Sequence, residues 1–400
     1  MSTPSPERAV AVLSVAAFGS SASLRCTDAL LPLLAADFGT TAGSAAMVIT
    51  AFSVAYGLFQ VLHGPLGDKL GKYRLAFITT LISTFGTLAC AVAPSLEVIV
   101  VARFVAGATI GAIIPLAMAW IGDVVPYVNR QSVLARFLIG QMLGVAGGAS
   151  FGGYLGEHFG WRSPFYLLAV FYAVVSVLLW LELKGNPHTR VAGAAAPSSI
   201  ADGFRRMGQL LRDPWVRTML ATVAAEGALF YGSLAFVALH LHNKLGLGLG
   251  ASGTSVGAYA VGGMLYAVVS KKLVRRLGER GLVLVGGCTI GVAFLGLVAA
   301  GSIATVLPCL LFVGVGLYML HNTLQVNATQ MAPDSRGAAL ALFAFTLFSG
   351  QSLGIWAGSR IVDAFGTTPL FLATAIGMPL LALEFRRRLA RRAAQQAAAK

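Results

Sequence analysis

The chain has 400 residues, of which 57% are hydrophobic and 11% are charged, and its formal net charge is +14. An average soluble domain has about 25% charged residues, so this composition excludes an ordinary soluble protein. The net charge alone would also fit a nucleic-acid-binding protein, and the positions of the basic residues decide between nucleic acid and membrane.

Twelve apolar segments are each long enough to cross about 30 Å of hydrocarbon as a helix. They are residues 9–35, 44–66, 75–93, 97–121, 132–156, 164–183, 215–241, 251–270, 281–301, 303–330, 338–360 and 368–385. With both termini in the cytoplasm, most of the 29 lysines and arginines fall in inner loops and in the C-terminal tail, as the positive-inside rule requires. The charge is therefore explained by a lipid bilayer, and no nucleic acid is expected.

The first span contains two opposite charges in the stretch "ASLRCTDALLPLLAADFG" at residues 22–39. Arg25 and Asp28 are three residues apart, so they share one face of a helix. A charge at the centre of a membrane helix costs about 2.5–3.5 kcal/mol on the insertion scale, and such residues are expected to face a polar cavity. Arg103 in the fourth span and Glu226 in the seventh are the other charges deep within the predicted spans.

These four residues form the predicted proton-coupling site. We expect Asp28 to be the main proton carrier, with Arg103 at a comparable depth as its partner and Arg25 either tuning it or fixing the helix. Glu226 is the second candidate, for a proton or a cationic substrate. The alternatives are a permanent ion pair that only fixes helix packing, and a Glu226 carboxylic acid that is hydrogen-bonded within the second half.

The loop between the second and third spans reads "GPLGDKLGKYRL" at residues 64–75. Its glycines permit close helix packing, and its aspartate can lie against a helix N-terminus. One of its basic residues is expected to pair with Asp123, at the inner end of the fourth span, and so to hold an inner gate closed. The predicted gating residues of the loop are Gly64, Asp68, Lys69, Gly71, Lys72 and Arg74. Alternatively, a basic loop of this kind only sets the topology.

The fifth and eleventh spans carry matching rows of glycine. Residues Gly144, Gly148 and Gly152 recur every four positions, and 206 residues later the chain has Gly350, Gly354 and Gly358. The match implies a duplicated six-helix unit. Small residues at this spacing let helices approach closely, so we expect both rows to be moving gate contacts; the alternative is a tight but static contact.

A hydrophilic interval at residues 185–214 separates six spans from six. It begins as a linker rich in small residues and proline, and it continues as the basic stretch "FRRMGQLLRDPW", which is expected to form an amphipathic helix on the inner membrane surface. The predicted organisation is an N-terminal six-helix bundle at 1–184, a cytoplasmic linker at 185–214, and a C-terminal six-helix bundle with a basic tail at 215–400.

The tenth span contains several polar residues in the stretch "LHNTLQVNATQ". We predict that His321, Asn322 and Gln325 bind substrate, because amide and imidazole groups both donate and accept hydrogen bonds. Aromatic residues of the second and seventh spans are expected to add a wall to the cavity, and these are Tyr56, Phe59, Phe230 and Tyr231. The alternatives are a structural histidine and aromatic rings that face lipid or packing interfaces.

Several of these motifs resemble those of the major facilitator superfamily. The loop at 64–75 matches its loop signature, and Arg103 with Gly107 matches the arginine signature of its fourth helix. The stretch "GVAGGASFGG", which includes Gly153, resembles the signature of its drug:proton antiporters, although Ala149 stands in place of a proline. The opening "TDALLPLLAADFG" resembles the first helix of bacterial multidrug and sugar-efflux members.

This resemblance implies an all-α membrane protein of the bacterial cytoplasmic (inner) membrane. Its twelve transmembrane helices would form two pseudo-symmetric six-helix bundles, with spans one, four, seven and ten around a central cavity. A monomer would be the complete carrier, and its partners would be protons, a small-molecule substrate and the lipid bilayer.

The predicted function is secondary active transport, in the form of proton-coupled efflux (antiport) of a small organic compound by alternating access. The alternatives are a facilitator or proton-coupled importer of a polar metabolite and, in a different class, a transporter-like sensor or a membrane enzyme. The sequence has no metal-ligand cluster, nucleotide-binding loop or nucleophile constellation, so we expect no enzymatic activity, cofactor or metal. All four cysteines lie within predicted spans, so no disulfide framework is expected either.

Overall fold

The structure is a computed structural model that describes residues 6–190, 200–332 and 336–398. Within these ranges it contains helices and turns and no β-strand, which confirms the predicted all-helical class. The elements are α1 (Pro6–Arg25), α2 (Leu31–Asp37), α3 (Ala42–Ala45), α4 (Met47–Leu70), α5 (Lys72–Ala91), α6 (Leu96–Ile110), α7 (Ile113–Val124), α8 (Tyr127–Phe159), α9 (Ser163–Gly185), η1 (Pro187–Arg190), α10 (Ile200–Leu210), α11 (Pro214–Glu226), η2 (Gly227–Tyr231), α12 (Gly232–Leu234), α13 (Val237–Leu245), α14 (Leu249–Ala299), α15 (Ile303–Gln330), α16 (Arg336–Phe365) and α17 (Thr367–Ala398).

Ten helices in the described residues are long and apolar enough to cross a membrane, whereas the sequence predicts twelve. One of the ten, α14, is two helices joined at Gly278, whose φ of 62° and ψ of 177° are not helical. A positive φ of this kind is open to glycine without strain. The 20-residue α1 is not among the ten. A count of twelve therefore rests on taking α14 as two spans and α1 as one.

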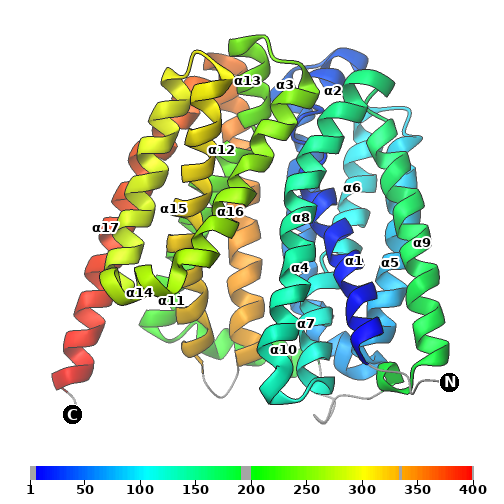
Figure 1. Cartoon of the computed structure of the whole chain (residues 1–400), viewed down its shortest axis with the longest axis vertical. Coiled ribbons are helices and arrows are strands. Elements are labelled where there is room, and N and C mark those ends of the chain that lie inside the picture. Colours follow the sequence, from blue (N-terminus) through cyan, green and yellow to red (C-terminus); the bar gives the residue numbers. More distant parts are fainter. Residues whose placement is uncertain (1–5, 191–199, 333–335, 399–400) are drawn as a thin grey trace.

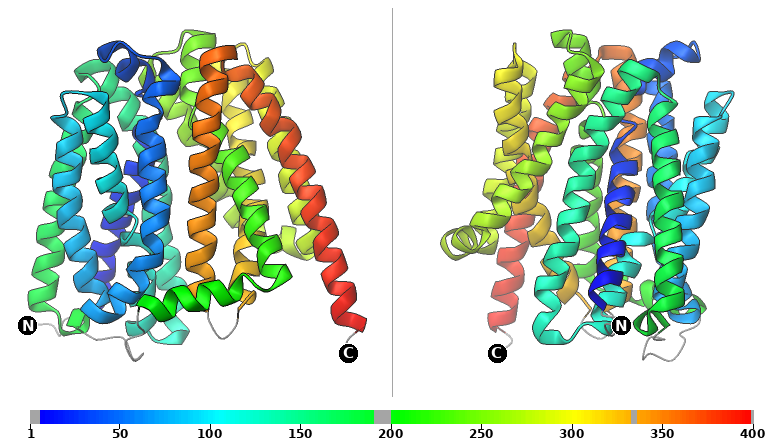
Figure 2. Two further views of the ribbon diagram at one scale, coloured as in Figure 1. Left: turned by 180° about the vertical axis from the view of Figure 1, so that it is seen from behind. Right: turned by 45° about the vertical axis from the view of Figure 1, so that its right-hand side comes forward.

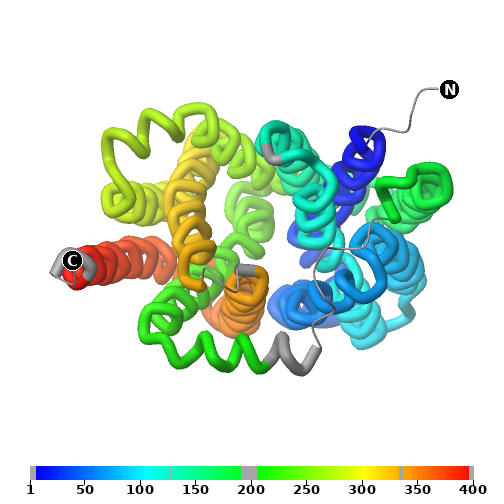
Figure 3. The backbone as a smooth tube through the Cα atoms, turned by 90° about the horizontal axis from the view of Figure 1, so that it is seen from below, coloured from blue at the N-terminus to red at the C-terminus, as the bar shows by residue number. Residues whose placement is uncertain are grey.

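The helices stand in two groups side by side (Figure 1 and Figure 3). We call α1–α9 the first half and α11–α17 the second half. The start of α1 and the end of α17 lie at the same end of the molecule, here named the terminal face, and α2, α3 and α13 lie at the other end, here named the opposite face (Figure 1). Both groups are thus built from helices that run between the same two faces.

Large apolar side chains are exposed along the outside of the helices. Phe85 and Val101 in the first half are each 64% exposed, and Val268 and Val292 in the second half are 84% and 70% exposed. Many exposed apolar side chains of this size are unfavourable in water, and they are what a lipid-facing helix presents. The composition and the exposed surface therefore agree that the chain is a multi-pass membrane protein.

The predicted glycine rows pack within each half. A Cβ atom on Gly144, Gly148 or Gly152 of α8 would collide with a carbonyl oxygen of α1 or of the residue that follows it, at Phe18, Ala22 and Cys26 respectively. In the second half, a Cβ on Gly350 or Gly354 of α16 would collide with the carbonyl oxygens of Ala224 and Ala228. Gly358 is less crowded, because a Cβ there would lie 3.2 Å from the Leu370 side chain.

Other glycines bring the two halves together. A Cβ on Gly153 of α8 would collide with the carbonyl oxygen of Leu249, and a Cβ on Gly253 of α14 would collide with that of Ala149. On the other side of the interface, a Cβ on Gly57 of α4 would lie 2.6 Å from the Cβ of Phe348. Contacts between the halves therefore depend on glycines outside the two repeated rows, and movement along the rows stays a prediction.

The α1–α8 contact makes a stability prediction that two adjacent glycines can test. Gly148→Ala is expected to lower the free energy of unfolding by about 1–3 kcal/mol, because the new methyl group must displace backbone. Gly147→Ala is the matched control, since its Cβ would meet only the Phe18 ring, at 3.5 Å. Melting temperatures of the purified proteins in detergent measure the difference. Equal melting temperatures for the two variants would contradict the close α1–α8 contact.

The basic stretch after the linker forms α10, which lies across the terminal face (Figure 2 and Figure 3). Arg205 and Arg206 are exposed on this helix, and Met207 is buried. This arrangement is that of a helix with one face toward the bundle and one face toward water or headgroups. Residues 191–199 of the predicted linker lie outside the described residues.

Candidate substrate and proton site

The first predicted span is broken where its charged pair lies. The helix α1 ends at Arg25, and the next helix, α2, begins at Leu31. Two tight turns fill the gap, in which the Asp28 N–H donates to the Arg25 carbonyl at 3.2 Å and the Leu30 N–H donates to the Thr27 carbonyl at 2.9 Å. Pro32 contributes to the break because it has no N–H to donate to the Asp28 carbonyl, as a continuous helix would require. Irregular backbone at membrane depth is typical of a transporter's binding site.

The seventh predicted span is also irregular. The helix α11 ends at Glu226, and the π-turn η2 follows immediately over Gly227–Tyr231. A second interruption separates α12 from α13, which begins at Val237. Single π-turns inside α-helices occur frequently at functional sites. The two halves therefore each place a buried acidic residue beside a disturbed helix.

Arg25 and Asp28 form a buried ion pair where the halves meet. Arg25 Nη1 lies 3.2 Å from Asp28 Oδ2, and their side chains are 1% and 0% exposed. The guanidinium also lies over two rings of the second half, 5.2 Å from the Tyr231 centroid and 6.0 Å from the Tyr259 centroid. A residue of the first half is thus held by aromatic rings of the second, and a buried cation over a ring is stabilised by about 2 kcal/mol.

Part of this pair has no hydrogen-bond partner among the described residues. The unpartnered atoms are Arg25 Nε and Nη2 and Asp28 Oδ1. Buried polar atoms are nearly always paired, and leaving one unpaired costs about 1–3 kcal/mol. The site therefore has free donors and a free acceptor for a proton, a water molecule or a polar substrate group.

Arg103 lies in the same region but has a different partner from the one expected. Its Nη2 donates to the Ser23 carbonyl at 3.1 Å, and its guanidinium stacks 3.8 Å from the Phe52 ring centroid. The direct ionic partner of Asp28 is Arg25 rather than Arg103. The physical reason is that α1 ends at Arg25, which leaves the Ser23 carbonyl in its last turn close enough to accept a hydrogen bond from Arg103. Arg103 therefore ties α6 to α1 beside the site.

Glu226 and His321 form a second buried pair within the second half. His321 Nδ1 lies 2.9 Å from Glu226 Oε2, and the glutamate is 0% exposed. Glu226 Oε1 has no partner in the described part of the chain. The pair joins α11 to α15, the helices of the seventh and tenth predicted spans. Sequence reasoning singled out both residues without connecting them.

The other predicted substrate residues of α15 are placed differently. Asn322 lines a separate cavity of about 470 Å³, together with Glu279, Asn327 and Arg392. Gln325 is exposed, one helical turn beyond His321. Of the three predicted residues, only His321 is joined to a buried acidic residue.

The predicted aromatic residues divide between the interface and the core. The Tyr56 ring lies 4.5 Å from that of Phe348 in the other half, and its hydroxyl is 3.4 Å from Ser20 Oγ. Tyr231 contacts Arg25 as described. Phe230 was expected in the cavity wall, but it is 0% exposed, and its ring packs against Phe294 in the core of the second half. The helical rotation between successive residues turns one ring inward and the next toward the interface.

Sequence reasoning missed several interface residues. Tyr259 of α14 lies beside Arg25, and Gln351 of α16 donates to Ser53 Oγ of α4 at 2.8 Å. Tyr259 is an aromatic residue in an apolar helix, so periodicity in the sequence offered no reason to place it at the interface. Gln351 is a polar residue inside the eleventh predicted span, and it could have been noticed on that ground.

The predicted gating loop makes one of its expected contacts. Lys72 Nζ lies 2.6 Å from Asp123 Oδ2 and 3.6 Å from Asp68 Oδ1, so Lys72 is the base that reaches Asp123. Lys69 and Arg74 are exposed, and Gly71 has a φ of 88° at the start of α5. Gly64 was expected to permit close packing, but a Cβ there would meet nothing within 4 Å. Gly67 is the crowded position, because a Cβ there would lie 2.6 Å from Leu116 Cδ2.

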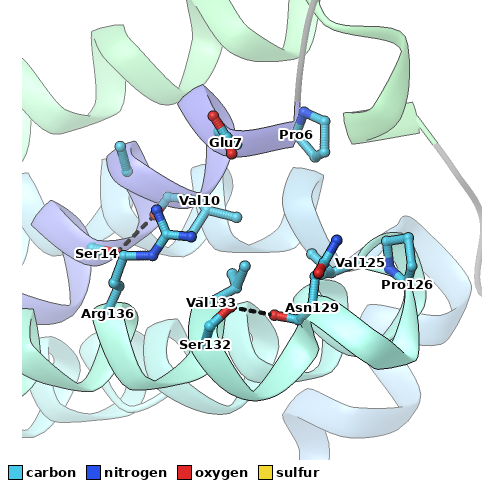
Figure 4. A pocket seen from close by; sticks show the side chains of 11 residues that line it. Pro6, Glu7, Val10, Ser14, Val125, Pro126, Asn129, Ser132, Val133 and Arg136 are labelled. Carbon is cyan, nitrogen blue, oxygen red and sulfur yellow. Dashed lines mark hydrogen bonds between the residues drawn. The ribbon is translucent and has the colours of Figure 1, made fainter.

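A cavity of about 560 Å³ opens between the starts of α1 and α8, at the terminal face. Figure 4 shows Arg136 pointing from α8 toward Ser14 of α1, with Glu7 and Asn129 also on the lining. Ser14 is eleven residues before Arg25, or about 16 Å along a helix. The cavity is therefore separate from the buried charged pair and lies on the terminal side of it.

A family model described as Major Facilitator Superfamily matches residues 13–355. Two similar proteins are the inner membrane transport protein YdhP of Escherichia coli, 24% identical over 377 residues, and the uncharacterized MFS-type transporter YwfA of Bacillus subtilis, 25% identical over 313 residues. The first match covers 92% of this chain and 93% of that protein, and the second covers 78% and 72%. A multidrug resistance protein B homolog of Mycobacterium tuberculosis is 30% identical over 193 residues, which are 48% of this chain and 34% of that protein.

Solved transporter structures have a similar fold. A mutant of the nucleoside transporter NupG superposes with a TM-score of 0.78 over 94% of this chain and 98% of its own, at 14% identity. A POT family transporter in complex with 5-aminolevulinic acid gives a TM-score of 0.76 over 94% and 95%, also at 14% identity. At this identity the similarity establishes the fold alone.

Proposed function

Since the chain belongs to the Major Facilitator Superfamily, we propose that it exports a small organic compound in exchange for protons, as a secondary active transporter that works by alternating access. It is a membrane transporter rather than an enzyme. The export part of the proposal is supported by the partial similarity to a multidrug resistance protein B homolog and by the glycine signature of α8. A monomer is proposed as the working unit.

The observation that carries the proposal is the half-satisfied Arg25–Asp28 pair. Asp28 is fully buried, has one oxygen without a hydrogen-bond partner among the described residues, and faces a cation that also contacts the second half. Adding a proton to Asp28 removes the charge that attracts Arg25. Arg25 is then left with its contacts to Tyr231 and Tyr259, so one proton changes the balance of forces between the halves.

Proton and substrate compete for the same groups in this mechanism. In the deprotonated state, Asp28 and the free donors of Arg25 offer a polar substrate partners of both charges. In the protonated state, the substrate loses its ionic contact and is released. Binding of a proton therefore releases the substrate from the same groups, as the exchange of proton and substrate in opposite directions requires.

Glu226 is proposed as a second protonatable group in the same cycle. Its pairing with His321 places a base beside the acid, so a proton can lie on either partner while the pair stays hydrogen-bonded. The free Oε1 of Glu226 is the atom available to a substrate. Asp28 remains the proposed main carrier because its ion pair lies between the halves, whereas Glu226 and His321 belong to one half.

The proposed orientation puts the terminal face in the cytoplasm. The basic helix α10 and the loop containing Lys69 and Lys72 lie at that face, as the positive-inside rule requires. The opposite face, where the halves contact through Gly153 and Gly253, is then the external one. The structure would thus represent a state closed toward the outside.

Transport by inside-out membrane vesicles tests the function. Candidate compounds are first selected by thermal-shift screening of the purified protein, and hits are then offered to vesicles with the chain and to matched vesicles without it. Export in exchange for protons predicts uptake that requires an acidic vesicle interior and stops when an ionophore dissipates the pH gradient. Uptake that ignores the gradient would indicate a facilitator, and gradient-driven uptake only into right-side-out vesicles would indicate an importer.

A further inference from the structure

Two acidic residues at the opposite face each bind the other half of the molecule. Glu157 lies near the end of α8, and its Oε2 accepts a hydrogen bond from the Gly250 N–H at 2.7 Å. Asp363 lies near the end of α16, where Oδ1 accepts from the Gly43 N–H at 2.9 Å and Oδ2 accepts from Thr41 Oγ1 at 2.7 Å. Each contact crosses from one half to the other.

The two contacts are equivalent under the internal repeat. Glu157 and Asp363 are 206 residues apart, the same separation as the repeated glycines, and Gly43 and Gly250 are 207 residues apart. The first half therefore offers its carboxylate to the second, and the second offers its own to the first. Two unrelated surface contacts would have no reason to agree in separation to within one residue.

The backbone around each contact is shaped to receive a carboxylate. A Cβ on Gly43 would collide with the Asp363 carboxylate and with the Ser359 carbonyl oxygen. A Cβ on Gly248 would collide with the Glu157 carboxylate, and one on Gly250 would lie 3.2 Å from Glu157 Oε2. Glycine is thus present where a side chain would keep the carboxylate from its N–H donor.

Both carboxylates are exposed to solvent at this face. A charge-assisted hydrogen bond to a backbone N–H is stronger than a neutral one, but water competes for an exposed carboxylate. Each contact is therefore weak enough to break on every transport cycle. Deeper in the interface, the halves meet through buried contacts, among them Arg25 over the Tyr231 and Tyr259 rings and the hydrogen bond from Gln351 to Ser53.

We propose that Glu157 and Asp363 are paired locks that hold the opposite face closed, and that both locks open when the halves part there. The inference requires only that the chain is a transporter with two moving halves. It is independent of the transported compound, of the direction of transport and of proton coupling.

Distances between spin labels on the two halves test the locks. Labels are attached to Glu97→Cys in the first half and Asn243→Cys in the second, both exposed near the opposite face. Cys288 and Cys309 are replaced by serine, because one is exposed and the other half-buried, while Cys26 and Cys90 are buried and stay. The full-length protein is measured in lipid nanodiscs by pulsed electron paramagnetic resonance.

The expected result is a several-fold increase in the longer-distance population for Glu157→Ala and for Asp363→Ala, and a larger increase for the double variant. Glu157→Gln and Asp363→Asn keep an acceptor oxygen without the charge, and they should give an intermediate shift. If an alanine variant fails to fold, the distances are measured on the corresponding amide variant, Glu157→Gln or Asp363→Asn. A distance distribution unchanged from the parent in the double variant would overturn the proposal.

Asp37→Ala is the matched control at the same face. The Asp37 carboxylate binds Trp161 Nε1 at 2.8 Å and Arg162 Nη1 at 3.1 Å, and all three residues belong to the first half. Its removal should leave the distance distribution unchanged. A shift as large as that of the lock variants would mean that any loss of charge at this face opens it, and would also overturn the proposal.

Discussion

Asp28→Asn is expected to abolish substrate accumulation driven by a pH gradient, and also to lower uptake in the absence of a gradient, because the protonated form is the one that releases substrate. The amide has nearly the shape of the carboxylic acid, so the variant resembles a permanently protonated carrier. It keeps a hydrogen-bond acceptor for Arg25, whose Nη1 now lies 3.2 Å from the carboxylate, but it cannot release a proton. Uptake into vesicles with and without an imposed gradient measures both activities.

Glu226→Gln provides the comparison for this result. If Asp28 is the main carrier, the glutamine variant should retain accumulation driven by the gradient, with an altered dependence on pH because His321 loses its acidic partner. The opposite outcome, with accumulation kept in Asp28→Asn and lost in Glu226→Gln, would transfer the role of main carrier to Glu226. Accumulation kept in both variants would refute proton coupling through either residue.

Arg25→Met is expected to be among the most destabilising single changes in the chain. Removing one partner of a buried ion pair leaves the other charge unpaired, and the usual loss of stability is about 3–5 kcal/mol. Methionine fills much of the same volume, so the effect reports the lost charge more than a lost contact. Denaturation midpoints of the purified protein in detergent measure the loss.

The double variant Arg25→Met with Asp28→Asn separates the structural role of the pair from its transport role. With both charges gone, no unpaired charge is left, and most of the lost stability should return. Transport driven by a pH gradient should stay absent. If the double variant regained gradient-driven transport together with stability, the pair would only fix helix packing, which is the alternative noted from the sequence.

The overall architecture was predictable from the sequence because the bilayer leaves few choices for an apolar chain. Length, hydropathy and the positions of the basic residues determine how a chain inserts into a membrane, so they indicated an all-helical membrane fold. The repeated halves were inferred from the glycine rows that recur after 206 residues. The sequence also predicts the division of α14 into two spans, because the charged stretch "SKKLVRRLGERG" separates residues 251–270 from 281–301. The non-helical φ and ψ of Gly278 fall within this stretch.

Asp28, Arg25 and Glu226 were conspicuous in the sequence because charges inside spans are rare, and the spacing of Arg25 and Asp28 already offered them as a pair. The partners of Arg103 and Glu226 could not be predicted, because they depend on how helices rotate against one another. The end of α1 at Arg25 offered Arg103 a backbone carbonyl to bind, and a π-turn that includes Phe230 follows Glu226. Such local departures from a regular helix follow from tertiary packing, which periodicity does not contain.

The reciprocity of Glu157 and Asp363 has a consequence for the origin of the chain. In a twofold-symmetric dimer, each surface patch binds its own copy, so a single residue makes two identical contacts. A half-length ancestor with one carboxylate at the position of Glu157 and one glycine at the position of Gly43 would have formed both contacts by pairing with itself. Fusion of two copies would then have let the contacts diverge, which accounts for a glutamate on one side and an aspartate on the other.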